Sequence, residues 1–284
     1  MVLKKIDFLT FGFLIITGIL ILCGGWHPNQ TGMLLLVRLL SMVGAIIVIY
    51  WHSKQDNRFT GLLRIAYPLI LTGYYYQETV HYNKLFFQNL DPVVSHVERI
   101  IFGCQPSLEF SRLMPMSWFS ELMYFGYFSY YLIIIGFCIA LFYQKSEHLT
   151  RCIFLVTSSF FLFYLIFAIV PVCGPQFYFR YPYNVVPNGY IFEHLVRSIQ
   201  ESGEQPTGAF PSSHVGLSVI ILFLSAKYAY RYFLGILPIV VFLILSTVYI
   251  KAHYLVDVVG AFLVFPSILW ISHLLYRYLP GDGE

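Results

Sequence analysis

The stretch HYLVDVVGAFLVFPSILWISHLLYR, residues 253–277, decides the fold class because it joins a short polar motif to a long apolar run. A membrane-spanning helix needs about 20 mostly apolar residues. Further runs of this kind precede it, over residues 8–24, 33–51, 61–77, 118–143, 152–172, 212–229 and 232–250. The sequence therefore predicts an all-α protein, a polytopic membrane helical bundle of about eight spans.

The composition is that of a membrane protein. Of the 284 residues, 58% are hydrophobic and 11% are charged, whereas soluble domains contain about 25% charged residues. The net charge of +3 is small, and no run of lysines or arginines indicates a nucleic-acid surface. We therefore expect an integral membrane protein whose partner is the bilayer, with no nucleic-acid partner.

Lysine and arginine placement predicts the orientation in the membrane, because short cytoplasmic loops carry an excess of these residues. With the N-terminus inside, the basic connections 143–151 and 227–231 are also inside, whereas the connection 24–32, which has no lysine or arginine, is outside. Both polar motifs described below then lie on the outer side. The sequence thus predicts an extracytoplasmic site, in the cell membrane if the protein is bacterial.

The first polar motif is His253-Tyr-Leu-Val-Asp257, at the start of the last apolar run. Side chains four residues apart lie on one face of a helix. Asp257 is therefore placed to accept a hydrogen bond from one imidazole nitrogen of His253, which leaves the other nitrogen free to attack an electrophile. The alternative is a buried histidine–aspartate pair that only ties two spans together.

The second polar motif is Gly208-Ala-Phe-Pro-Ser-Ser-His214, at the start of another apolar run. Proline and serine suit the first turn and the cap of a helix, and the free N–H groups of a helix start bind anions. Ser212 and Ser213 are thus candidate phosphate-binding residues, and His214 is a candidate acid for a leaving alkoxide. The alternative is a capped helix start with an interfacial histidine.

A site for phosphoryl transfer also needs positive charge for the phosphoryl oxygens. Lys251, two residues before His253, and Arg180, in the connection before the second motif, are candidates, and Arg197 is a third. The alternative for each is an interfacial cation whose stem lies along apolar surface.

Together these residues resemble the type-2 phosphatidic acid phosphatase superfamily. The second signature of that family, P-S-G-H, is matched by Pro211-Ser-Ser-His214, and the third, S-R-x5-H-x3-D, by residues 246–257 with Thr247 in place of arginine. The first signature is absent, and Gly174-Pro175 and Asp91-Pro92 resemble the inositol phosphorylceramide synthase branch. The resemblance implies a six-helix catalytic core over residues 61–284, preceded by two transmembrane helices within residues 1–60.

The resemblance implies an integral membrane lipid phosphatase or phosphotransferase. His253 would attack phosphorus while His214 protonates the departing oxygen, and Lys251, Arg180, Ser212 and Ser213 would surround the resulting phosphohistidine. His214 would then activate water or a lipid alcohol, with no metal and no cofactor. The expected substrate is a lipid phosphate or a phospholipid, and a lipid alcohol is the candidate acceptor.

Two other classes of function remain open from the sequence. A metal-dependent membrane hydrolase would use His253 and Asp257 with His214, Glu78 or His81 as ligands. A non-catalytic transporter or lipid-binding scaffold would use Glu121, which lies in an apolar run, as a relay. The alternative for Glu121 is a structural role in an interhelical hydrogen bond.

Overall fold

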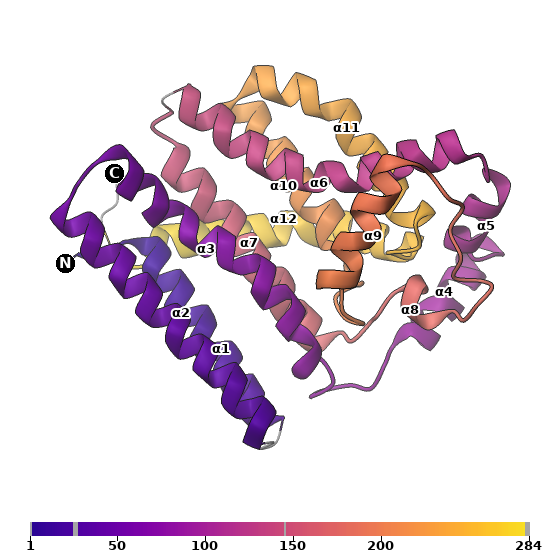
Figure 1. Ribbon diagram of the computed structural model, residues 1–284, viewed down its shortest axis with the longest axis horizontal. Coiled ribbons are helices and arrows are strands. Elements are labelled where there is room, and N and C mark those ends of the chain that lie inside the picture. The colour runs from indigo at the N-terminus through magenta and orange to yellow at the C-terminus, as the bar shows by residue number, and fades with distance from the viewer. Residues whose placement is uncertain (1, 25–27, 145, 282–284) are drawn as a thin grey trace.

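The computed structural model describes residues 2–24, 28–144 and 146–281, and every regular element in these ranges is a helix. The predicted all-α class is therefore confirmed (Figure 1). Each predicted apolar run coincides with a long helix whose ends differ from it by a few residues. These helices are α1 (Lys5–Cys23), α2 (Pro28–Lys54), α3 (Arg58–Glu78), α6 (Ser117–Tyr143), α7 (Leu149–Ile169), α10 (Ser213–Tyr228), α11 (Tyr230–Tyr249) and α12 (Leu255–Tyr278).

Six of these helices, α1, α2, α6, α7, α11 and α12, are long and apolar enough to cross a membrane. The two others fall short for different reasons. Helix α10 has only 16 residues, which rise about 24 Å. Helix α3 contains Pro68 and ends on the polar pair Gln77-Glu78. The six apolar helices fit an integral membrane protein, as the composition predicts.

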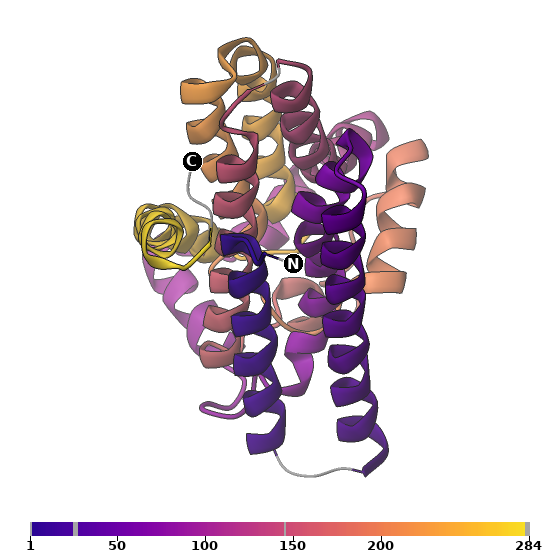
Figure 2. The ribbon, with the colours of Figure 1, turned by 90° about the vertical axis from the view of Figure 1, so that its left-hand side faces the viewer.

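The centre of the bundle is α7, which is apolar on all sides and buried along most of its length. It packs against α1, α3, α6, α10 and α12, while α11 packs against α6 and α10. Figure 2 shows α1, α2 and α3 beside this group. The predicted boundary between residues 60 and 61 falls just inside α3, and the division into an N-terminal pair and a core stays a prediction.

Short helices occupy the two long connections between the long helices. The first connection contains η1 (Thr79–His81), α4 (Asp91–Phe102) and α5 (Pro106–Leu113), and the second contains α8 (Pro175–Tyr178) and α9 (Ile191–Gly203). Figure 1 shows α4, α5 and α8 gathered at one end of the bundle. This end also carries the starts of α10 and α12, so the connections enclose both polar motifs.

Candidate active site

His253 lies in the connection between α11 and α12, two residues before α12 begins. Its Nδ1 is 2.8 Å from the Ala209 carbonyl oxygen and 3.6 Å from Oδ2 of Asp257. The predicted hydrogen bond between His253 and Asp257 is therefore wrong. The prediction assumed one continuous helix over both residues, whereas His253 precedes the helix.

Asp257 instead caps the helix that follows His253. Its Oδ2 accepts a hydrogen bond of 2.7 Å from the backbone N–H of Tyr254, and its Oδ1 is buried without a hydrogen-bond partner among the described residues. The tautomer of His253 is set by Ala209, because a carbonyl oxygen only accepts. Nδ1 of His253 therefore carries the proton, and Nε2 holds the free lone pair.

His214, the second residue of α10, is the partner of that lone pair. Its Nδ1 lies 3.3 Å from Nε2 of His253. The His214 ring is held between two tyrosines, with its centroid 4.7 Å from that of Tyr127 and 4.3 Å from that of Tyr130. The structure thus brings the two predicted histidines together from the starts of two different helices.

The serines of the second motif hold the start of α10. Oγ of Ser212 accepts a hydrogen bond of 3.3 Å from the N–H of Val215, and the Ser212 N–H donates to the Asp257 carbonyl at 3.1 Å. Ser213, 5% exposed, begins the helix. Because the first N–H groups of a helix have no partner within it, this helix start can bind an anion through its backbone.

The position of the Ala209 carbonyl depends on Gly208. Gly208 has φ of +74°, and a Cβ there would lie 3.0 Å from the ring of Phe167. The N–H of Ala209 donates to the Val172 carbonyl at 3.0 Å. The backbone of Ala209 therefore links two segments: its N–H group binds the connection before α8, and its carbonyl oxygen binds His253.

His214 and His253 line one small cavity, and none of the three predicted cations, Lys251, Arg180 and Arg197, lines it. The ammonium group of Lys251, 3% exposed, donates to the carbonyl oxygens of Tyr183 and Val185. Burial lowers the pKa of Lys251 to about 8. Arg180 has an exposed side chain in the same connection, and Arg197 pairs with Glu193 at 2.7 Å. Lys251 therefore anchors a loop.

Glu204 is the charged residue that the sequence did not indicate. It follows α9, and it lines one small cavity together with His214 and His253. The hydroxyl of Tyr127 donates to its Oε1 at 2.5 Å, and the side-chain amide of Gln176 donates to its Oε2 at 2.6 Å. Among the described residues that line this cavity there is no lysine or arginine. In the sequence, Glu204 is one of several acidic residues in the connection before the second motif, and nothing in its spacing distinguishes it from the others.

Burial sets the charge of His253. It lowers the pKa of His253 to about 4, and the hydrogen bond to Ala209 and the charge of Glu204 oppose this shift. His253 is therefore neutral near pH 7, with its lone pair on Nε2.

Two further carboxylates position the backbone around His253. Asp91 of α4 accepts hydrogen bonds from the N–H groups of Cys173 and Gly174, at 2.8 and 2.9 Å, and from the hydroxyl of Tyr254 at 3.1 Å. Glu98, also of α4, accepts from the N–H of Leu255 at 2.6 Å. Burial raises the pKa of Glu98 to about 7. Asp91 thus joins the connection before α8 to Tyr254, and Glu98 joins α4 to the start of α12.

An apolar groove adjoins the small cavity. It has a volume of about 480 Å³ and lies between α3, α6 and α7, where Leu69, Ile134 and Phe160 are among its walls. The groove and the small cavity share Glu204 and His214. An apolar chain in the groove would thus end at the histidines.

The residues of the two alternative functions have other partners. Glu78 pairs with Arg38, and Nδ1 of His81 lies 2.7 Å from the amide of Gln30. Over the ranges that the structure describes, no cluster of three or more His, Cys, Asp or Glu side chains is arranged for a metal ion. The predicted alternative ligand set is therefore not assembled.

Glu121, the predicted relay of a transporter, caps a helix. Its two carboxylate oxygens accept hydrogen bonds from the N–H groups of Tyr190, Ile191 and Phe192, at 2.7 to 2.9 Å. A carboxylate at the start of α9 is favourably placed for the helix dipole. Glu121 therefore has the interhelical structural role that was the alternative.

Comparison with known proteins identifies the family of the chain. The family model of the PAP2 superfamily matches residues 93–271, more than half of the chain, and this range includes both polar motifs. Searches of curated proteins and of solved structures give no match. On the strength of the family match, the chain belongs to the PAP2 superfamily.

Proposed function

We propose that this protein is a membrane lipid phosphatase or phosphotransferase whose nucleophile is Nε2 of His253. One observation carries the proposal: Nε2, left unprotonated by the hydrogen bond from Nδ1 to Ala209, faces His214 at 3.3 Å in a cavity that adjoins an apolar groove. Membership of the PAP2 superfamily supports lipid phosphatase-type chemistry in the membrane.

The proposed reaction has two steps. Burial and the neighbouring His253 lower the pKa of His214, so His214 takes up its proton when the phosphate anion binds beside it. The lone pair of His253 Nε2 attacks phosphorus, the bond from phosphorus to the leaving oxygen breaks, and His214 gives that proton to the leaving oxygen. In the second step the oxygen of water or of a lipid alcohol attacks the phosphohistidine. His214 takes the proton of that oxygen, and the P–N bond breaks to restore His253.

We propose that the start of α10 binds the phosphoryl oxygens. The N–H groups of Ser213 and His214 belong to its first turn, and the dipole of the helix favours an anion there. Lys251 then acts indirectly, because it anchors the loop at Tyr183 and Val185. Arg180, exposed at the turn that leads into this loop, is the candidate cation for a bound headgroup.

Glu204 favours one class of substrate. A phosphomonoester carries up to two negative charges, and a phosphodiester carries one, so a carboxylate in the same cavity repels the monoester more strongly. Glu204 can also accept a hydrogen bond from a hydroxyl or ammonium group. We therefore propose a phosphodiester lipid with a hydroxylated or amino headgroup as substrate, with its acyl chain in the groove, which agrees with the resemblance to the inositol phosphorylceramide synthase branch.

Product analysis tests this function. The purified protein in detergent is given phosphatidylinositol, phosphatidic acid or isoprenyl pyrophosphate, each with and without ceramide or diacylglycerol. We expect turnover of phosphatidylinositol, with the headgroup moved to the added alcohol, and none in the His253→Ala variant. Equal signals from the wild type and the variant would contradict the function, and preferred hydrolysis of phosphatidic acid would contradict the role of Glu204.

We also propose that the active site faces the outside of the membrane. Cys104, between α4 and α5 at the active-site end, has an exposed side chain. In sealed cells that carry the Cys23→Ala variant, a membrane-impermeant thiol reagent should label Cys104. Labelling only after lysis would reverse the proposed orientation.

A further inference from the structure

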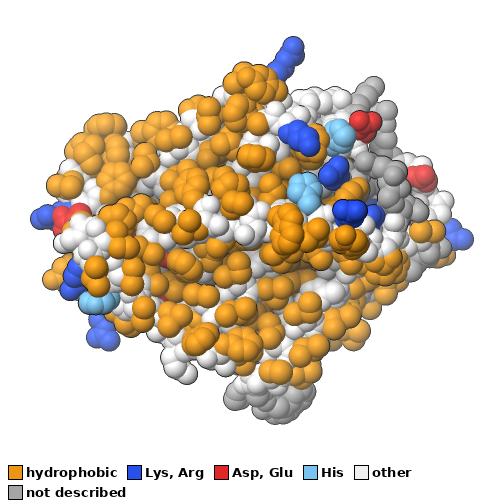
Figure 3. Space-filling view, turned by 180° about the vertical axis from the view of Figure 1, so that it is seen from behind, with side chains coloured by type: hydrophobic (Ala, Val, Ile, Leu, Met, Phe, Trp, Pro, Cys, Tyr) orange, Lys and Arg blue, Asp and Glu red, His pale blue; other side chains and the backbone are white. Residues whose placement is uncertain are grey.

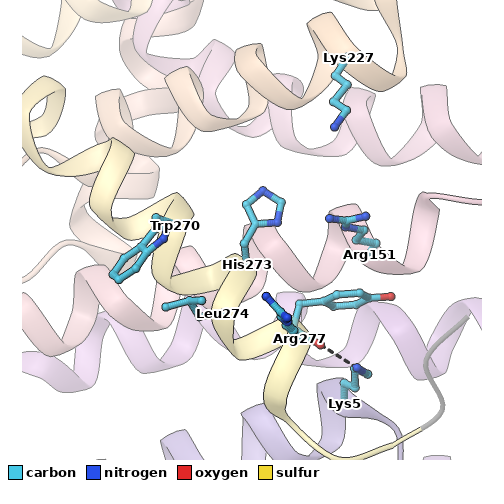
Figure 4. A pocket seen from close by; sticks show the side chains of 8 residues that line it. Lys5, Arg151, Lys227, Trp270, His273, Leu274 and Arg277 are labelled. Carbon is cyan, nitrogen blue, oxygen red and sulfur yellow. Dashed lines mark hydrogen bonds between the residues drawn. The ribbon is translucent and has the colours of Figure 1, made fainter.

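A second polar space lies at the other end of the bundle. It is a hollow of about 710 Å³, here called the basic hollow, lined by the cationic side chains of Lys5, Arg151, Lys227 and Arg277 and by His273 and Trp270. These side chains come from the starts of α1 and α7 and the ends of α10 and α12. Figure 4 shows Lys227, His273 and Arg151 pointing into one shared space.

The basic hollow is separate from the histidine pair. Helix α12 begins beside His253, at Leu255, and reaches the hollow at Arg277. At 1.5 Å per residue this distance is about 30 Å, the thickness of the hydrocarbon core. Helix α10 also separates the two sites, because His214 at its start and Lys227 at its end lie about 20 Å apart along the helix axis. A ligand of the hollow therefore belongs to the opposite leaflet.

The positive charge of the basic hollow is not neutralised by its walls. The described residues that line it include no aspartate or glutamate. Asp7, the acidic residue at the start of α1, is committed to Arg64 at 2.9 Å. Four cations around one space repel each other, so an anion placed between them is stabilised.

Arg151 adds an unused hydrogen-bond donor. Its Nε is buried, and in the part of the chain that the structure describes it has no hydrogen-bond partner. A buried donor of this kind is costly unless a ligand or water satisfies it. The guanidinium group is meanwhile held against the ring of Tyr276, 5.5 Å from its centroid. Arg151 is thus oriented before a ligand arrives.

The surroundings of the hollow favour a lipid over a soluble anion. Trp270, 62% exposed, lines the hollow, and tryptophan is typical of the membrane interface. Figure 3 shows a largely apolar surface with one group of lysine, arginine and histidine side chains on its right-hand side and a second group, beside acidic side chains, at its left edge. Basic pockets between membrane helices at the cytoplasmic side bind anionic headgroups.

We propose that the basic hollow binds the phosphate-bearing headgroup of an anionic membrane lipid, with the acyl chains beside Trp270. The phosphate lies between Arg151, Lys227 and Arg277. This lipid is not the substrate of the histidine pair, and the proposal does not depend on the reaction proposed above.

Native mass spectrometry of the full-length protein tests the proposal, with phosphatidic acid as the probe and phosphatidylcholine as the zwitterionic control. Every protein carries His253→Ala, so that bound lipid is not turned over. We compare the double variant Arg151→Gln/Lys227→Gln with Arg231→Gln, which removes an exposed cation near the same end outside the hollow.

We expect the double variant to lose one bound phosphatidic acid, with an affinity about thirtyfold lower because two cations are removed. The Arg231→Gln control should keep it, and phosphatidylcholine should not bind there. Equal binding by the double variant and the control would overturn the proposal. If the double variant does not fold, Lys227→Gln alone, at an exposed position, tests it with a loss of about fivefold.

Competition separates a lipid site from a site for any phosphate. Glycerol 3-phosphate is added at the concentrations at which phosphatidic acid binds. If only the lipid binds, the proposal is supported. If the soluble phosphate displaces phosphatidic acid from the hollow at equal concentration, the acyl chains contribute nothing and the lipid assignment is overturned.

Discussion

The two ends of α12 have opposite chemistry. At its start, Asp257 and Glu98 accept hydrogen bonds from backbone N–H groups, and Glu204 lines the cavity of the histidine pair, which has no lysine or arginine in its described lining. At its end, Arg277 belongs to a hollow whose described walls hold cations and no carboxylate. One helix therefore joins a site built around the neutral His253 to a site built around unneutralised positive charge.

Most hydrogen bonds of the carboxylates at the active-site end come from backbone N–H groups. Asp91 binds the N–H groups of Cys173 and Gly174, and Asp257 and Glu98 bind N–H groups at the start of α12. Such contacts fix the backbone on both sides of His253 before any substrate binds, which is the preorganisation that the proposed reaction needs. The basic end instead leaves its charges open to a ligand.

The largest expected effect is that of His253→Ala. Removal of the nucleophile should lower kcat by at least about 10⁴-fold, as for other covalent nucleophiles. The matched control is His96→Ala, because His96 is an exposed histidine of α4 at the same end. Lipid turnover by both purified variants checks this. Wild-type turnover in His253→Ala would show that the histidine pair at the start of α12 is not the site of the reaction.

His214→Ala should have the next largest effect, because it removes the acid for the leaving group. We expect a loss of about 10² to 10⁴-fold with a phospholipid. The loss should be much smaller with a nitrophenyl phosphodiester, whose leaving group needs no proton. The burst of leaving-group release with both substrates checks this, because it reports the first step alone, and an equal loss of the burst rate with both would contradict an acid role.

Asp91→Ala should lower stability. It removes a buried acceptor of three hydrogen bonds, and the expected loss in the free energy of unfolding is about 3 kcal/mol. Glu109→Gln is the control, because its pair with Arg112 is exposed and is worth less than about 1 kcal/mol. Thermal unfolding in detergent compares them. Equal melting temperatures would show that Asp91 does not hold this end together.

Glu204→Gln should change substrate choice more than overall rate. Loss of the carboxylate charge removes repulsion of a dianionic phosphate. We expect the ratio of kcat/KM for phosphatidic acid to that for phosphatidylinositol to rise by about tenfold. An unchanged ratio would mean that the negative charge of this cavity does not select the substrate.

The smallest effect concerns pH. Because burial lowers the pKa of His253 to about 4, its charge should not change between pH 5.5 and 7.5. Between about pH 6.5, the ordinary pKa of histidine, and about pH 4, the unfolded chain binds a proton at His253 and the folded protein does not. The free energy of unfolding should therefore fall as the pH is lowered from about 6.5 to about 4. Histidine NMR signals, assigned through His253→Ala, check this. A titration midpoint near 6.5 would contradict the burial of His253.

The sequence predicts the helices and the histidine pair well for a physical reason. Long apolar runs have few alternatives to membrane helices, and ionisable residues at their ends are rare enough to mark a site. The predicted hydrogen bond between His253 and Asp257 is wrong, because the four-residue spacing does not reveal that α12 begins only at Leu255.

The remaining contacts join connections far apart in the chain. Lys251 binds backbone carbonyls of residues 183 and 185, and Glu204 meets His253 through the fold of the second connection. The basic hollow takes its cations from four helices. The distribution of lysine and arginine indicates one side of the membrane for these cations, and only the packing of the helices brings them to one place.

The most direct test of the central claim is to find the covalent intermediate. The protein is mixed with phosphorus-labelled substrate, quenched without acid, digested and examined by mass spectrometry, with His253→Ala as the control. We predict that the substrate phosphate, with its headgroup, is bound to Nε2 of His253, because Nδ1 is occupied by the Ala209 carbonyl. Turnover with no label on His253, or a label on Nδ1, would contradict the account.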